Sequence, residues 1–101
     1  MADVDYKVIW SEGAQLDFRE ILEYIADDNP DAAIRVGEMI MSRINQLINF
    51  PQMGSRIPEE PMLEMRQVVA GNYPVIYRVA EKRGVIGIVR IWHGVRGEFE
   101  I

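Results

Sequence analysis

The feature that most constrains this chain is a pair of helical hydrophobic repeats with only a short turn between them. Apolar residues recur every three or four positions in both repeats: Ala14, Phe18, Ile21, Leu22 and Ile25, then Ala33, Val36, Ile40, Ile44, Leu47 and Ile48. Such spacing predicts two amphipathic helices. Asn29 can cap the second helix, and Pro30 suits its first position, where a backbone N–H has no helical partner. Two helices joined by so short a turn should form an antiparallel hairpin.

The residues around the hairpin predict its limits and the rest of the fold. Ser11 suits an N-cap for the first helix, which should end near Ala26, and Pro51 and Gly54 should stop the second. Short β-rich runs predict four strands: Lys7–Trp10, Leu63–Ala70, Tyr73–Ala80 and Val85–His93. Residues 51–62 should form a proline-rich loop. We therefore expect one α+β domain over residues 1–101, of order β-α-α-β-β-β. The N-terminal strand should belong to a mainly antiparallel sheet. The antiparallel helix hairpin should pack on one face of that sheet.

The loop between the last two strands predicts how they pair. If Lys82-Arg83-Gly84 is a three-residue hairpin loop with Gly84 left-handed, then Glu81 pairs with Val85. Three cross-strand pairs follow and share one face: Arg78 with Ile88, Ile76 with Arg90, and Pro74 with Trp92. The other face has no full charge and should pack on the helices: Tyr73, Val75, Tyr77, Val79, Val89, Ile91 and His93. The face that carries the arginines should be open.

Composition excludes several classes of site. The chain has no cysteine and one histidine, His93, so we expect no disulfide, no metal site and no cofactor. No apolar run approaches the roughly 20 residues that span a bilayer, and the acidic start does not resemble a signal peptide. We therefore expect a cytoplasmic protein with no membrane partner. The net charge of −5 disfavours binding to a polyanion, which depends on Lys and Arg neutralising phosphates.

An ordered set of motifs runs through residues 6–96. The first helix has Ala14-x-x-Asp17-Phe18-x-x-Ile21 and Tyr24-Ile25. The second has Asn29-Pro30 and Ile44-x-x-Leu47-x-x-Phe50-Pro51-x-x-Gly54. The strands have Arg66, Asn72-Tyr73-x-Val75-Ile76-Tyr77-Arg78 and Val89-Arg90-Ile91-Trp92-His93-Gly94-x-Arg96. This set resembles the ParE/RelE superfamily of bacterial toxins, whose members are often described as plasmid stabilisation proteins.

The resemblance implies the toxin of a type II toxin–antitoxin system, neutralised by the extended C-terminal segment of a cognate antitoxin. RelE-like members are ribosome-dependent mRNA endoribonucleases, whereas ParE-like members inhibit DNA gyrase. Here Pro74 replaces an arginine of the RelE-like pattern, strand 63–70 has Arg66 but no lysine, and the tail 97–101 has no tyrosine. We therefore predict a ParE-like gyrase inhibitor rather than an enzyme. An mRNA endoribonuclease that meets the ribosome, and a non-toxic orphan binding module of the same fold, are the alternatives.

The resemblance and the predicted register together select candidate site residues. The target-binding candidates are Arg90, Trp92 and Arg96. The antitoxin-binding candidates are Ile76, Arg78, Ile88, Arg90 and Trp92. If the chain cleaves RNA, the catalytic candidates are Arg66, Arg90, His93 and Arg96, because cleavage needs an acid or base and cations around the phosphate.

Several of these residues also have structural interpretations. His93 should point to the packed side, as a hydrogen-bonded structural histidine. Arg90 can pair with Glu64 or another strand carboxylate, and Trp92 can be covered by the chain's own tail. The first helix also carries acidic residues that we interpret as a solvated face: Asp17, Glu20 and Glu23.

Overall fold

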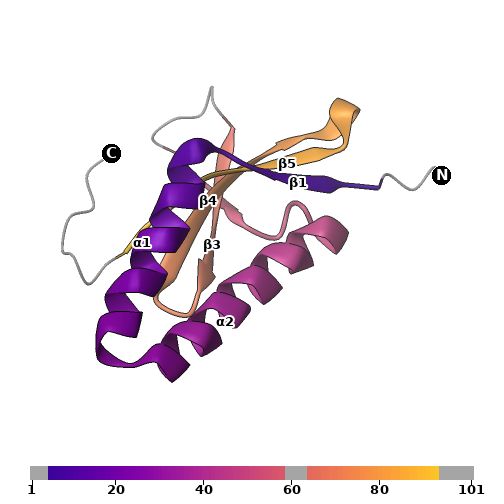
Figure 1. Cartoon of the computed structure of the whole chain (residues 1–101). Coiled ribbons are helices and arrows are strands. Elements are labelled where there is room, and N and C mark those ends of the chain that lie inside the picture. The colour runs from indigo at the N-terminus through magenta and orange to yellow at the C-terminus, as the bar shows by residue number, and fades with distance from the viewer. Residues whose placement is uncertain (1–4, 59–63, 94–101) are drawn as a thin grey trace.

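The computed structural model of the protein describes residues 5–58 and 64–93. Within them the chain forms two layers, with a helix hairpin against one face of a five-stranded sheet (Figure 1). Helix α1 spans Glu12–Asp28 and helix α2 spans Pro30–Asn49. The strands are β1 (Lys7–Trp10), β2 (Ser55–Arg56), β3 (Met65–Ala70), β4 (Tyr73–Ala80) and β5 (Val85–Ile91). The predicted α+β fold and element order are confirmed, with the two-residue β2 as an addition inside the predicted loop.

The hairpin turn uses one residue for both helices. The backbone N–H of Asn29 donates to the Ile25 carbonyl at the end of α1. Its side-chain Oδ1 accepts from the N–H of Ala32, 3.1 Å away, and caps α2 with Pro30 in the first position. Helix α1 therefore runs to Asp28, two residues beyond the predicted end. This turn holds the helices antiparallel, as the sequence predicts.

The sheet order is β1-β5-β4-β3-β2. Strand β1 pairs parallel with β5, and the other three pairings are antiparallel. The β3–β4 connection is the predicted turn, with Gly71 at a left-handed φ of 62°. The last strand therefore lies between β4 and the first strand, with α1 packed against it. Among the residues that the structure describes, we find no helix whose length and hydropathy suffice for a membrane span.

The core lies between the hairpin and the sheet. Its largest fully buried side chains come from both layers: Ile21, Ile40, Ile44, Leu47, Val75, Tyr77, Ile86, Ile88 and Ile91. Tyr73 and His93 are also buried, as the alternation of β4 predicts for the first and that of β5 for the second. Burial of this apolar surface is the main driving force for the two layers to associate.

The predicted β4–β5 register is correct in one half of the hairpin and wrong in the other. Next to the turn, Ala80 rather than Glu81 pairs with Val85, because Glu81 belongs to a 3₁₀ turn that ends at left-handed Gly84. Arg78 consequently lies opposite Gly87, not Ile88. A bulge at Val89 then restores the predicted pair of Ile76 with Arg90.

The bulge decides which residues face the helices. Ile88 pairs with Tyr77 and belongs to the core at 1% exposure, so the predicted open position of this residue is wrong. Beyond the bulge, Ile91 and His93 are buried as predicted. Strand β5 ends at Ile91 rather than His93, and Glu64, with a φ of 52°, is not extended before β3. The predicted start of that strand at Leu63 lies outside the described residues.

Candidate functional site

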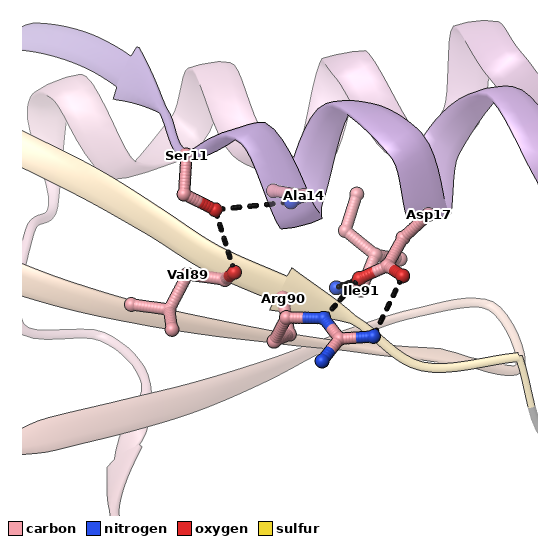
Figure 2. Close-up of polar contacts among 6 residues, drawn as sticks. All are labelled: Ser11, Ala14, Asp17, Val89, Arg90 and Ile91. Atoms are coloured by element: carbon pink, nitrogen blue, oxygen red, sulfur yellow. Dashed lines mark hydrogen bonds and ion pairs between the residues drawn. The ribbon is translucent and has the colours of Figure 1, made fainter.

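The first polar cluster lies where β1 ends and β5 continues. The N–H of Ser11 donates to the Ile88 carbonyl at 3.0 Å, as the last backbone bond along this edge. The Ser11 Oγ then donates to the Val89 carbonyl at 2.8 Å and accepts from the N–H of Ala14 at 3.0 Å (Figure 2). Ser11, which caps α1, thereby also bonds to the bulged residue of β5. Side chains of α1 take over from β1 as partners of the β5 edge.

Asp17 continues this role one turn further along α1. Its Oδ2 accepts from the backbone N–H of Ile91 at 2.9 Å and from Arg90 Nε at 2.7 Å. Its Oδ1 accepts from Arg90 Nη2 at 2.9 Å, which makes the pair bidentate (Figure 2). We call Ser11, Asp17 and Arg90 the Asp17 cluster. The interpretation of Asp17 as part of a solvated helix face is wrong, because its side chain is only 11% exposed.

The partner of Arg90 also differs from the expected one. The sequence suggested Glu64 or a strand carboxylate, whereas the observed carboxylate comes from α1. The Arg90 side chain remains 45% exposed, and its Cζ lies over the Trp92 ring, 4.9 Å from the ring centroid. The hydrogen bond to Asp17 raises the pKa of Arg90, against the opposing effect of partial burial. Arg90 is therefore a charge that is already neutralised on one side and supported by an aromatic ring on the other.

A shallow depression of about 290 Å³ adjoins this cluster, lined by Asp17, Glu20, Ile21, Arg90, Ile91, Trp92 and His93. His93 is 8% exposed. It packs against two tyrosine rings, with centroids 5.0 Å from Tyr24 and 5.7 Å from Tyr73. The prediction that His93 points to the packed side is confirmed. Two carboxylates share the depression with one arginine, an arrangement that disfavours a phosphate group.

The second polar cluster joins the loop after α2 to the sheet. The Tyr77 hydroxyl, on a side chain with 0% exposure, donates to the Pro51 carbonyl and accepts from the N–H of Gly54, both at 2.8 Å. Arg66 Nη1 donates to the carbonyls of Gly54 at 2.7 Å and Gln52 at 3.2 Å. We call Tyr77, Gly54 and Arg66 the Tyr77 cluster. Burial raises the pKa of Tyr77, partly offset by the Gly54 hydrogen bond and the charge of Arg66.

The structure therefore separates the residues that RNA cleavage would need. Arg90 and His93 line one depression, whereas Arg66 lines another together with Gln52, Arg56, Glu64, Val79, Glu81 and Lys82. Arg96 and the tail 97–101 lie outside the described residues. Within the described residues, no group of three histidine, cysteine, aspartate or glutamate side chains is arranged to hold a metal ion.

The face of the sheet that points away from the helices carries the remaining candidates. Arg78 is exposed, Trp92 is half-buried, and Ile76 is only 6% exposed. The side chain of Ile88 belongs to the core on the opposite face because of the register change. A groove of about 420 Å³ crosses the strands here, lined by Ile9, Trp10, Ser11, Arg78, Val79, Ala80, Arg83, Val85, Gly87, Ile88 and Val89. We call it the β1–β5 groove.

Sequence reasoning missed three residues that organise these clusters. Ser11 was predicted as a helix cap only, and its bond to Val89 depends on a bulge that no pattern indicates. Asp17 was interpreted only as part of a solvated helix face, and Gly54 only as a stop for the second helix. A Cβ atom on Gly54 would lie 2.6 Å from Tyr77 Oη and 2.7 Å from the Gln67 carbonyl oxygen, so this position admits only glycine.

Comparisons with known proteins identify a matching family and relatives. The family model for the ParE toxin of the type II toxin–antitoxin system parDE matches residues 8–97. The chain is 32% identical to Toxin RelE2 of Caulobacter vibrioides over 89% of this chain and 97% of that toxin. It is 23% identical to Toxin RelE1 of the same organism over 89% and 95%.

Two solved structures share the fold. A chain of the chromosomal ParDE system from P. aeruginosa superposes with a TM-score of 0.70 at 21% identity, over 88% of this chain and 96% of that one. A chain of the RelBE2 toxin–antitoxin complex from Mycobacterium tuberculosis superposes with a TM-score of 0.63 at 21% identity, over 89% and 99%.

Proposed function

This chain belongs to the ParE toxin family of type II toxin–antitoxin systems, and from that premise we propose that it inhibits DNA gyrase by binding and is not itself a nuclease. The observation that carries the proposal is the bidentate Arg90–Asp17 pair. A ribonuclease needs cations that can reach the phosphate in the transition state. The Arg90 guanidinium already has a carboxylate on the side facing α1, with Glu20 nearby in the same depression.

The other catalytic candidates support the same proposal. Arg66 donates to two loop carbonyls, so its guanidinium holds the loop in place. His93 is buried between tyrosine rings rather than presented to a substrate. We propose that the surface around Arg90 and Trp92, together with Arg96, contacts the protein target. An indole ring beside an arginine suits a protein interface, where both residue types are frequent anchors.

We further propose that a cognate antitoxin neutralises the toxin by docking its C-terminal segment on the open sheet face. The residues proposed for this contact are Ile76, Arg78, Arg90 and Trp92, with Ile88 withdrawn because it lies in the core. The ParDE and RelBE2 structures that share the fold are toxin–antitoxin systems, which supports a protein partner of this kind.

An mRNA endoribonuclease is the second candidate. The curated relatives bear the names Toxin RelE2 and Toxin RelE1, and this observation favours it. In that case Arg90 would have to exchange Asp17 for a phosphate, and Arg66, His93 and Arg96 would have to reach the same scissile bond. A non-toxic binding module is the third alternative.

One pair of assays separates the three functions. Purified protein is added to DNA gyrase with relaxed plasmid, and in parallel to ribosomes translating a defined mRNA. We expect loss of supercoiling, restored by equimolar antitoxin, and intact mRNA. Cuts positioned at codons with unaffected gyrase would overturn the proposal in favour of the nuclease. No effect in either assay, with no growth defect on induction, would leave a binding module.

A further inference from the structure

The β1–β5 groove contains an empty position at its centre. Gly87 in β5 lies opposite Ile9 of β1 on one side and Arg78 of β4 on the other. A Cβ atom built on Gly87 would meet no other atom within 4 Å. Its φ lies outside the left-handed region, so the backbone does not require glycine here. The missing side chain thus serves neither a turn nor close packing, and it leaves a depression in the open face.

The walls of the groove are aliphatic. Ile9 is 54% exposed, and Val85 and Val89 are half-buried. An exposed isoleucine on a strand, facing an empty position, is apolar surface that a partner can remove from water at about 25 cal/mol per Å². The groove therefore has the dimensions and lining for one or two apolar side chains.

The charge around the groove is opposite to that of the molecule. The chain has 16 Asp and Glu against 11 Lys and Arg. The described residues that line the groove nevertheless include Arg78 and Arg83 and no carboxylate. Within the described part of the chain, neither arginine has an ion-pair partner, in contrast to Arg90. Two guanidinium groups beside apolar walls fit a segment in which carboxylates flank an apolar side chain.

We propose that the β1–β5 groove binds an acidic, apolar segment of the antitoxin, with one apolar side chain seated over Gly87 and its neighbouring carboxylates paired with Arg78 and Arg83. This inference rests on the proposed function and adds the residue that determines partner specificity. Any side chain at position 87 would fill the space over Gly87. The glycine therefore makes the toxin selective for partners that insert an apolar side chain into this space. It also extends the proposed antitoxin contact from Arg90 and Trp92 to β1.

The test fills the seat without disturbing the fold. Gly87→Leu and Gly87→Ala are compared with wild type by calorimetric titration with purified full-length cognate antitoxin. Thermal melts check the fold, which should be retained because nothing contacts the new Cβ. We expect Gly87→Leu to bind at least about 10-fold more weakly, and Gly87→Ala to show a smaller loss, as for a blocked interface pocket.

Charge-reversal variants test the flanking arginines. Arg78→Glu and Arg83→Glu should each weaken binding and flatten its dependence on salt. Arg35→Glu makes the same change at an exposed position of α2, in the other layer, and should leave affinity unchanged.

The outcomes distinguish the groove from the wider proposal. If wild type does not bind the antitoxin, the neutralisation proposed above fails and the groove inference fails with it. If wild type binds and folded Gly87→Leu binds equally tightly, only the groove inference is overturned. A single-stranded RNA oligonucleotide is titrated in parallel. Loss of RNA affinity in Gly87→Leu with unchanged antitoxin affinity would assign the groove to nucleic acid and also overturn the inference.

Discussion

The Tyr77 cluster and the Asp17 cluster have the same structural role but differ in burial. In both, a side chain bonds to backbone groups that no strand reaches: the loop over Pro51–Gly54 in one, the β5 edge beyond Ile88 in the other. The Tyr77 side chain has 0% exposure, whereas Arg90 is 45% exposed. Water can therefore reach the guanidinium of the second cluster more readily than the hydroxyl of the first. The same bonding role should therefore matter more for stability at Tyr77 and leave more freedom for function at Asp17.

The largest effect should come from Gly54→Ala. The new methyl would overlap Tyr77 Oη and the Gln67 carbonyl, and the backbone atoms cannot move without opening the loop. We expect a loss of about 3 kcal/mol in the free energy of unfolding, from overpacking and broken hydrogen bonds. Urea denaturation measures it, with Gly87→Ala as the matched control at an open position. Equal stability of the two variants would show that the Tyr77 cluster tolerates change as readily as the sheet surface.

Tyr77→Phe should have the next largest effect. It keeps the ring in the core but leaves the Gly54 N–H and the Pro51 carbonyl without their partner. A buried group left unsatisfied costs about 2 kcal/mol. The control is Tyr24→Phe, an exposed tyrosine whose loss should be within error. A negligible change at position 77 would mean that water already reaches the loop.

The same substitution should alter stability at alkaline pH. Burial raises the pKa of Tyr77 above its ordinary value of 10.0, so the folded state retains this proton after the unfolded state has begun to lose it. Stability is therefore complete below pH 10.0 and falls as pH rises towards the folded-state pKa. Tyr77→Phe removes this contribution, so its unfolding free energy should fall less steeply than that of wild type. Tyr73, whose pKa burial also raises, accounts for part of the remaining slope. Parallel curves for the two proteins would contradict the assignment.

Asp17→Ala should cost less than either change in the buried cluster. It leaves the Ile91 N–H and the Arg90 guanidinium without the carboxylate, but the Arg90 side chain is 45% exposed and can be hydrated. We expect a loss of about 1 kcal/mol and faster hydrogen exchange at the Ile91 amide. Glu23→Ala, at an exposed position on the same helix, is the control. Destabilisation as large as that of Tyr77→Phe would remove the distinction between the clusters.

Arg90→Lys should have the smallest effect on stability. Asp17 keeps its bond to the Ile91 N–H and lysine keeps the positive charge, so we expect a loss of about 0.5 kcal/mol. Lysine cannot reproduce the bidentate geometry, so any function of Arg90 in target binding should suffer more than stability does. The gyrase assay and a thermal melt on the same sample make the comparison. A loss of stability without a loss of inhibition would place Arg90 in a purely structural role.

Hydrophobic spacing was sufficient to predict the hairpin, the strand order along the chain and the inward side of β4. Each of these depends on periods that repeat within one element, as at Ile40, Ile44 and Leu47. The position of Ile88 was not predictable in the same way. It depends on whether Glu81 belongs to a strand or to a turn. This difference of one residue moves every side chain of β5 up to the bulge to the opposite face of the sheet.

The candidate site was predicted in part. Arg90 and Trp92 could be placed next to one another from the predicted alternation of strand 85–93 and the predicted pairs with Ile76 and Pro74. The partner of Arg90 could not be predicted, because Asp17 lies 73 positions away and no local pattern relates α1 to β5. Gly54 is a similar case, since its requirement for glycine arises from a tyrosine 23 positions later. Arg96 remains a prediction.

The parallel pairing of β1 with β5 has a consequence for how the chain folds. The helix hairpin and the β3–β4–β5 meander join neighbours in sequence, whereas Ser11 meets Val89 across 78 positions. Loop-closure entropy depends only weakly on such a distance, by about 0.6 kcal/mol per doubling, but long-range pairings form slowly. A nascent chain can therefore form the helix hairpin early, whereas β1 can pair only after β5 has been synthesised. The β1–β5 groove, with walls from both strands, comes into existence only at that last step. A partner that binds there would recognise the finished molecule and ignore its folding intermediates.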